Sequence, residues 1–241
     1  HKNKDWNREA YRIIQLLLRK GANINLKDRS KRTPLHRAVQ GTDQKIIEFL
    51  ISKGARVNEV DNKGRTPLFE AVASLNSPDI VSLLIKKGAN VNAVISNPCE
   101  DCTSDTSPLL QATKSAFTLR MPRAFDIIKI LLKNNANILQ KNGEGDDAYT
   151  MALKDKKLFG HDKFNLVGLY KSYYDKAKSE SSKEGEKWFK LGRKEELAKS
   201  NKKAKAYYKK SCEVNHPTGC TNYGFFEEKS GNVELGKKIY K

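Results

Sequence analysis

Short apolar segments recur at a nearly constant interval along the N-terminal part of the chain. These segments are 13–18, 46–51, 80–85 and 127–132. The first three are each followed by a Lys-Gly-Ala-x-x-Asn motif, which begins at Lys20, Lys53 and Lys87, at intervals of 33 and 34 residues. A degraded copy, Asn134 to Ile138, follows the fourth. Such a period is typical of an elongated array of helix pairs, so we expect an all-α repeat solenoid.

The residues that flank the apolar segments indicate where the helices begin and end. Thr33 and Thr66 each precede a proline, and Thr is a favoured N-cap while Pro is tolerated at the first helical position. Gly21, Gly54 and Gly88 each follow an apolar segment, where a residue with positive φ ends a helix. Each period therefore predicts a first helix that starts at Thr-Pro and a second helix that ends at glycine.

The segment from Thr33 to His36 reads Thr-Pro-Leu-His and returns as Thr66 to Phe69, 33 residues later. These residues resemble the ankyrin repeat, whose Thr-Pro-Leu-His helix start and 33-residue period are specific when repeated. The resemblance implies a protein-binding solenoid, in which the ring of His36 bonds neighbouring backbone. We expect the ankyrin array to cover residues 1–174, in about five repeats.

The predicted array is irregular at both ends and near its middle. Residues 1–9 are too few for a complete first helix of the first repeat. The interval from Thr66 to Ser107 is 41 residues, so an insertion separates the third and fourth repeats. A weak fifth repeat begins at Gly145 and ends near Tyr174. Ankyrin insertions fall at hairpin tips or interhelical turns, the surfaces that meet partners.

The composition changes after the array, and residues 175–241 form a second predicted domain. Residues 177–183 are polar and read as a linker or a solvated helix. The Trp-x-x-Leu-Gly pattern at 188–192 is that of a tetratricopeptide-type helix hairpin, and 220–224 is its equivalent 32 residues later. This part resembles a pair of Sel1-like repeats of the bacterial cysteine-rich subgroup. That resemblance implies a disulfide between Cys212 and Cys220, which joins one hairpin to the next.

The four cysteines bear on the cellular compartment. The alternative for Cys212 and Cys220 is two buried thiols in a reducing cytosol, whereas a bridge implies an oxidising compartment. For Cys99 and Cys102, which lie in the insertion, we favour a local disulfide. Half a zinc site and free or redox-active thiols stay open. Zinc would need two further ligands, and no histidine lies nearby.

No motif in the chain predicts catalysis, a cofactor or a metal. The zinc-protease, nucleophile-elbow, Walker and dinucleotide-binding patterns are absent from the sequence. The acidic, glycine-rich segment 142–147 makes calcium conceivable, but it lacks the ligand order of an EF-hand and falls where a repeat hairpin belongs. We therefore expect a protein that is not an enzyme and takes no small-molecule substrate or cofactor.

The charge of the chain bears on its partners. Lys and Arg number 46 against 28 Asp and Glu, a net charge of +18, which favours acidic partners. We argue against nucleic acid, because no aromatic residues alternate with a basic stripe. The apolar runs are too short for a membrane span.

Ankyrin arrays bind through their hairpin tips and the exposed side of their first helices. Carried over position by position, the resemblance makes the following residues the candidate partner-binding surface: Arg29, Ser30, Arg32, Gln40, Asn62, Lys63, Arg65, Ser74 and Lys114. The basic members at the tips are of special interest because we expect packing between repeats not to require a charge there.

Our leading functional hypothesis is an exported ankyrin protein, periplasmic or secreted after removal of an N-terminal signal. Such a protein would bind and inhibit or sequester an acidic-surfaced periplasmic enzyme, for example a peptidoglycan hydrolase. It would resemble bacterial ankyrin proteins that act as self-protection or immunity factors. Two alternatives remain: a secreted effector or adaptor that binds host proteins, and a basic protein that binds an anionic polymer such as cell-wall glycan or nucleic acid.

Overall fold

The computed structural model describes residues 2–95, 106–119, 122–159, 165–214, 216–232, 235 and 239. Within these ranges the chain forms eleven α-helices and no named strand, which confirms the predicted all-α fold. The chain divides into two compact units, His1–Lys171 and Ser172–Lys241.

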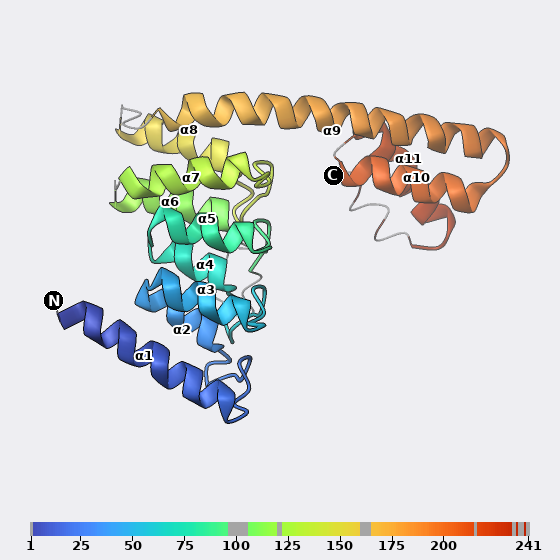
Figure 1. Cartoon of the computed structure of the whole chain (residues 1–241). Helices are drawn as coiled ribbons and strands as arrows, with labels where there is room; N and C mark the ends of the chain where they lie inside the picture. Colours follow the sequence, from blue (N-terminus) through green and yellow to red (C-terminus); the bar gives the residue numbers. More distant parts are fainter. Residues whose placement is uncertain are drawn as a thin grey trace. The chain divides into compact units, whose positions relative to one another are not determined.

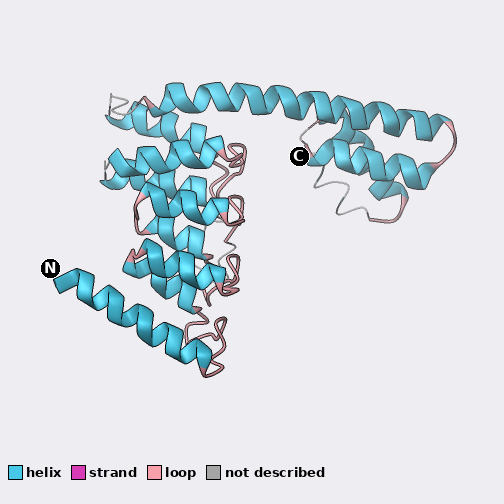
Figure 2. Ribbon diagram, in the orientation of Figure 1, coloured by secondary structure: helices cyan, strands magenta, loops and turns pink. Residues whose placement is uncertain are grey.

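The first unit is a stack of antiparallel helix pairs that follows one single helix (Figure 1). The single helix is α1 (Lys2–Arg19). The pairs are α2 (Pro34–Gly41) with α3 (Gln44–Ser52), α4 (Pro67–Ala73) with α5 (Pro78–Lys86), and α6 (Pro108–Leu119) with α7 (Pro122–Lys133); α8 (Ala148–Phe159) and the start of α9 (Leu166–Leu197) follow. Each first helix packs against the next one, so α2 contacts α4, α4 contacts α6, and α6 contacts α8. The loops that join successive repeats lie at one end of the helices (Figure 2).

Apolar side chains at equivalent positions of successive repeats form the core of this stack. Leu35 and Leu68 are fully buried, as are Ile47, Val81 and Ile128 of the second helices. Each layer buries its apolar face only against its neighbours, so the period read from the sequence becomes the period of the core.

The predicted helix boundaries hold, with one change of partner. Thr66 accepts a hydrogen bond at Oγ1 from the backbone N–H of Phe69 (3.2 Å), as an N-cap does. The hydroxyl of Thr33 instead bonds Nδ1 of His36 (2.9 Å). Gly21, Gly54 and Gly88 have φ of 85°, 93° and 89°, and the degraded copy places Asn135 at 60°. Glycine favours this left-handed conformation because it has no Cβ.

An asparagine ladder joins the ends of successive second helices. Asn25 donates from Nδ2 to the carbonyl of Gly54 (3.2 Å) and accepts from the N–H of Arg56 (2.8 Å). Asn58 makes the same pair of bonds with Gly88 and Asn90, and Asn92 with Asn135 and Asn137. The last Asn of each Lys-Gly-Ala-x-x-Asn motif therefore fixes the spacing between repeats.

The irregular repeats are resolved in different ways. The first repeat has α1 as one continuous helix, in place of a helix pair. The insertion is closed at its base by an antiparallel bridge, in which Ile95 and Thr106 exchange two backbone hydrogen bonds of 2.8 and 3.1 Å. Cys99 and Cys102 lie outside the described residues, so their pairing stays a prediction.

The second unit contains the remainder of α9, then α10 (Asn201–Glu213) and α11 (Pro217–Lys229). The segment predicted as a polar linker or a solvated helix is part of α9. The core is built from Ala204, Tyr208 and Phe226, with Phe189 and Tyr223 packed against it. A Cβ at Gly192 would lie 2.6 Å from the ring of Tyr208, so the glycine of the Trp-x-x-Leu-Gly pattern permits this close approach.

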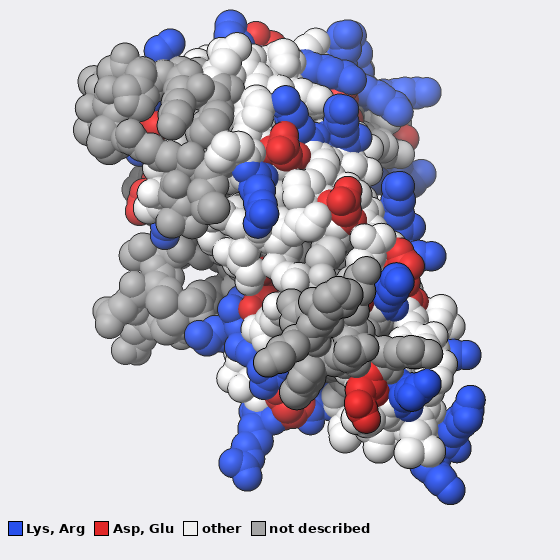
Figure 3. Space-filling model, turned by 60° about the vertical axis from the view of Figure 1, so that its left-hand side comes forward, with Lys and Arg blue, Asp and Glu red and all other residues white. Residues whose placement is uncertain are grey.

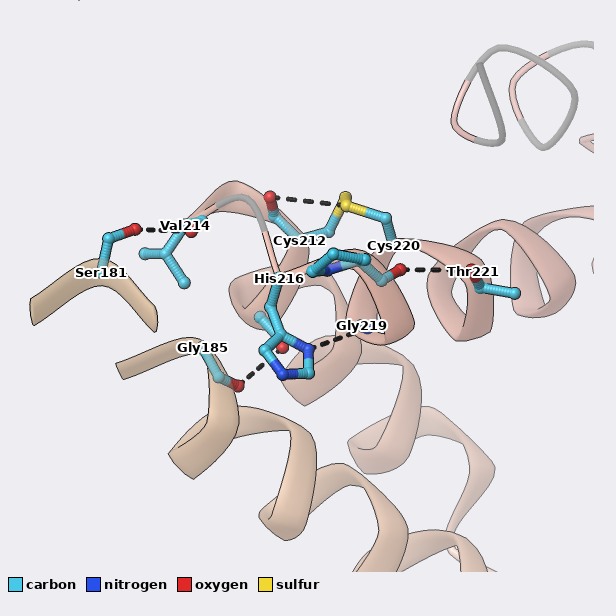
Figure 4. Close-up of a disulfide and its surroundings, with 10 residues drawn as sticks. Ser181, Gly185, Cys212, Val214, His216, Gly219, Cys220 and Thr221 are labelled. Atoms are coloured by element: carbon cyan, nitrogen blue, oxygen red, sulfur yellow. Dashed lines mark hydrogen bonds between the residues drawn. A yellow bond between two sulfur atoms is a disulfide. The ribbon is translucent and has the colours of Figure 1, made fainter. Parts of the chain in front are cut away.

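A disulfide between Cys212 and Cys220 joins the end of α10 to the start of α11 (Figure 4). Two further bonds tie the same turn to α9: Ser181 donates to the carbonyl of Val214 (2.6 Å), and Ser211 donates to that of Gly185 (2.7 Å). The bridge therefore lies where three helices meet.

Candidate protein-binding surface

The hairpin tips of the second and third repeats are held by aspartates. Asp28 accepts at Oδ1 from the N–H groups of Ser30 and Arg32 (2.8 and 2.9 Å). Asp61 does the same with the N–H groups of Lys63 and Arg65 (2.8 and 2.9 Å). These bonds close both tips in the same conformation, so the side chains on them are presented in the same way.

The two tips are also joined to each other and to the helices beside them. The N–H of Asn62 donates to the carbonyl of Ser30 (2.9 Å). His36 accepts at Nδ1 from the N–H of Thr33 (3.2 Å), so its Nε2 carries the proton and donates to the carbonyl of Arg65 (3.0 Å). Burial lowers the pKa of His36 and keeps the ring neutral. The expected structural role of His36, bonding to neighbouring backbone, is confirmed.

Arg65 is the centre of a half-buried ionic network. Its Nε and Nη2 donate to Oδ2 of Asp61 (3.0 and 2.8 Å), and its Nη1 lies 3.0 Å from Oε2 of Glu70. The side chain of Asp61 is fully buried and that of Glu70 is 8% exposed. Burial alone would raise the pKa of Asp61, but the N–H and guanidinium of Arg65 outweigh it, so the pKa is lowered.

Two more candidates belong to this network. Gln40 donates from Nε2 to Oε1 of Glu70 (2.7 Å), which links α2 to α4. The Nε of Arg32 lies 3.8 Å from Oδ2 of Asp61, and its side chain is only 21% exposed. The expectation that tip charges are not needed for packing is wrong for Arg32 and Arg65, because buried acidic groups of the array lie against both.

The other candidates are accessible to a partner. Arg29, Asn62 and Lys63 are exposed at the two tips, and Ser30 is half-buried there. Arg29 and Lys63 make no ion pair within the part of the chain that the structure describes. The remaining two are exposed on the first helices: Ser74 at the end of α4 and Lys114 on α6. The accessible charge of the candidate surface is therefore carried by Arg29, Lys63 and Lys114.

The wider distribution of charge gives little further localisation. Lys and Arg side chains spread over the visible face of the molecule, with fewer Asp and Glu among them (Figure 3). Lys53, Lys86 and Lys87 at the ends of α3 and α5 are exposed as well. Position on a rigid tip, rather than local charge density, distinguishes Arg29 and Lys63.

The second unit carries an aromatic and basic cluster that sequence reasoning missed. The rings of Trp188 and Tyr207 stack with centroids 5.8 Å apart. Lys210 and Lys187 place Nζ 4.5 and 5.3 Å from the Trp188 ring centroid. The four residues come from α9 and α10, so no local pattern joins them. Aromatic residues at helical spacing beside lysines were the available signal.

The structure explains the acidic segment 142–147 without calcium. Asn142 accepts at Oδ1 from the N–H groups of Glu144 and Asp146 (3.0 and 2.9 Å), as Asp28 and Asp61 do in their tips. Asp146 pairs with Lys154, and Asp147 caps α8 through the N–H of Thr150 (2.9 Å). Among the described residues, no three His, Cys, Asp or Glu are grouped to hold a metal.

None of the helices within the described ranges has the length and apolar content needed to cross a membrane. No curated protein matches the chain. The family model for ankyrin repeats, in three copies, matches residues 6–95. This range contains α1 to α5 and both tips described above. The N-terminal region is thus built of ankyrin repeats, a module that generally mediates binding between proteins.

Proposed function

We propose that this chain is a non-enzymatic inhibitor or sequestering protein that acts outside the reducing cytosol. Its target would be an acidic-surfaced enzyme of the periplasm, such as a peptidoglycan hydrolase, and its role self-protection of the producing cell. The observation that carries the proposal is the pair of rigid tips, on which Arg29 and Lys63 are exposed and free of ion pairs to described residues. Fixed basic groups speed encounter with an acidic partner and lose little side-chain order on binding.

The Cys212–Cys220 disulfide supports the proposed compartment. Disulfides persist in oxidising environments such as the periplasm and are rare in the cytosol. In the same compartment Cys99 and Cys102 would form a second, local bridge. Protein prepared from the periplasm would then contain no thiol that titrates with an alkylating reagent under denaturing, non-reducing conditions. Two or more titrating thiols would contradict the second bridge.

The binding test uses the oxidised full-length chain as bait in envelope extract, followed by kinetics with the captured enzyme. In the tip variant Arg29→Glu with Lys63→Glu, we expect slower association, and a larger loss at low salt than at high salt. The control, Lys86→Glu with Lys87→Glu, makes the same change of net charge away from the tips. Both variants should unfold within about 0.5 kcal/mol per substitution of the parent chain.

Equal loss of binding in the two variants would mean that the attraction is diffuse charge and that the tip site is wrong. Capture of an enzyme whose activity is unchanged by saturating bait would contradict inhibition, although it would leave sequestration by binding. Turnover of a substrate by the purified chain that one point mutation abolishes would contradict a non-enzymatic role.

A second candidate function is binding of an anionic polymer through the second unit. The Trp188–Tyr207 stack with its adjacent lysines favours it, because bases and sugars stack on aromatic rings while lysines attract anions. Trp188 fluorescence during titration with single-stranded DNA or cell-wall glycan fragments tests this candidate. We would expect quenching that weakens with salt and is lost in Tyr207→Ala; an unchanged spectrum would exclude it.

A further inference from the structure

The helix α1 exposes apolar side chains along one stripe. Ile13, Leu16 and Leu17 are 52%, 56% and 53% exposed. They lie three and four residues apart, so they share one face of the helix. The opposite face contacts the array through Tyr11, whose ring centroid lies 4.6 Å from that of Phe49 on α3.

The same positions are buried in every later repeat. Leu17 corresponds to Leu50, Leu84 and Leu131, which are 2%, 0% and 0% exposed. Ile13 corresponds to Ile80 and Ile127, which are 2% and 0% exposed. The residue type at these positions is that of a covered core, whereas the exposure is that of a surface.

The missing cover is a first helix. In the later repeats each second helix packs against its own first helix, as α3 does against α2 and α5 against α4. Because α1 continues straight through Lys2–Arg19, no such helix lies against Leu17 in the structure. The place is an open groove of about 430 Å³. It is lined mainly by Ile14, Leu17, Leu18, Pro34, Ala38 and Ile46.

The repeats themselves define what fits this groove. Its equivalents are filled by α2 and α4, helices of 8 and 7 residues. Both bear a Leu followed three and four residues later by Ala and Val, at Leu35 and Leu68. The occupant is therefore a short helix with a Leu-x-x-Ala-Val face.

Charge around the groove selects the character of the occupant's outer face. Arg12 and Lys20 lie one turn before and after Leu16, and Lys45 adjoins Ile46; all three are exposed. Of the nearby acidic residues, Asp43 already accepts from the N–H groups of Lys45 and Ile46, which leaves Glu9. A second copy of this chain would bring another +18 to the groove, so self-association is disfavoured.

We propose that the groove between α1, α2 and α3 binds an amphipathic helix of a partner protein, with a Leu-x-x-Ala-Val apolar face and an acidic outer face. The helix takes the place of the first helix of the first repeat and extends the stack by one element. This surface differs from the tips, so the proposal stands apart from the proposed inhibitor function.

The test uses two fluorescent peptides and the full-length chain. One peptide has the sequence of residues 64–77, and the other carries Arg65→Glu and Ser74→Glu in that sequence, which makes it acidic. Fluorescence anisotropy should show binding of both, with the acidic peptide about fivefold tighter at low salt. Ile13→Gln with Leu17→Gln should weaken binding by about tenfold or more, and Leu16→Gln alone by a smaller factor.

The matched control is Leu26→Gln with Leu197→Gln, which changes two side chains that are 66% and 79% exposed elsewhere. It should leave peptide affinity unchanged, and all variants should keep the thermal unfolding of the parent. The tip variant Arg29→Glu with Lys63→Glu should also bind the peptides normally, which separates this proposal from the proposed function. No binding of either peptide, or equal binding by the groove variants, would overturn it. A dimer in sedimentation that Leu17→Gln dissociates would overturn it in favour of self-association.

Discussion

The two units of this chain reach stability by different means. In the ankyrin-repeat unit the same contacts recur: an asparagine pair between repeats, an aspartate in each of three tips and one apolar layer per helix pair. In the second unit a few contacts occur once each, namely the buried Tyr208, the close approach at Gly192 and one disulfide. Repetition spreads stability over many equivalent sites, whereas the second unit concentrates it.

This difference has a functional consequence. A repeat can give up a regular element at its edge and still fold, since its neighbour supplies the contacts on the other side. That is how α1 can stand as a single helix and leave a groove. The second unit has no equivalent contact to replace one that is lost, so its binding residues must coexist with its core.

The largest effect that we expect breaks the rule of spread stability within the array. Arg65→Ala removes the partner of two buried carboxylates, those of Asp61 and Glu70, and should lower the free energy of unfolding by about 3 kcal/mol. Urea denaturation followed by circular dichroism measures it. Arg29→Ala, at a neighbouring tip, should change it by less than about 0.5 kcal/mol. Similar values for the two variants would mean that the ionic network contributes nothing.

Loss of the disulfide should affect only the second unit. Cys212→Ser with Cys220→Ser removes a short cross-link and should lower that unit's stability by about 2 to 3 kcal/mol. Amide hydrogen exchange, which resolves the two units, should show faster exchange in α10 and α11 and unchanged exchange in α2 to α7. Faster exchange throughout the array would contradict the division of stability between the units.

The units should also lose stability in different ranges of pH. Burial places the pKa of His36 below that of the unfolded chain, so this contribution is present above about pH 6.5 and is lost as the pH falls. Hydrogen bonds from Asn232, Tyr223 and Lys205 lower the pKa of Glu227 to about 2, so its contribution is lost only between about pH 4.5 and 2.

Stability of each unit against pH, measured by hydrogen exchange, tests this order. His36→Phe introduces the residue that the next repeat has at Phe69, and it should remove the decline of the array below pH 6.5. Glu227→Gln should remove only the decline of the second unit at low pH. A decline of the array that persists in His36→Phe would assign it to another group.

The smallest expected effect sharpens the comparison between tips. Lys31 has φ of 58°, whereas Gly64 and Gly145 occupy the same tip position with φ of 73° and 82°. A lysine pays strain in this conformation and glycine does not, so Lys31→Gly should stabilise the array by about 0.5 kcal/mol, after the added chain entropy of glycine. Thermal unfolding detects the change. The reverse substitution, Gly64→Lys, should destabilise it.

Much of the fold could be predicted from the sequence because its signals are local. The Thr-Pro steps, the glycines after Lys20, Lys53 and Lys87, and the spacing of apolar residues act within one helix or one turn. They placed the helix pairs, the irregular first repeat and the base of the insertion. A family resemblance added the pairing of Cys212 with Cys220, which spacing alone left open.

The candidate surface depended on contacts that no local pattern contains. Arg29, Arg32 and Arg65 are alike in sequence, as basic residues at repeat tips. Packing separated them, because the carboxylates of Asp61 and Glu70 are buried beside Arg65 and leave Arg29 in solvent. The Trp188–Tyr207 cluster was missed for the same reason, since two helices bring its members together.

Leu17 and Leu50 show the division most clearly. Their sequence surroundings are nearly identical, and the chain by itself determined that both lie on the apolar face of a second helix. Only the tertiary structure decided that Leu50 is core and Leu17 is 53% exposed. Burial is a property of the neighbours that a residue meets in space, and the neighbour that covers Leu50 has no counterpart over Leu17.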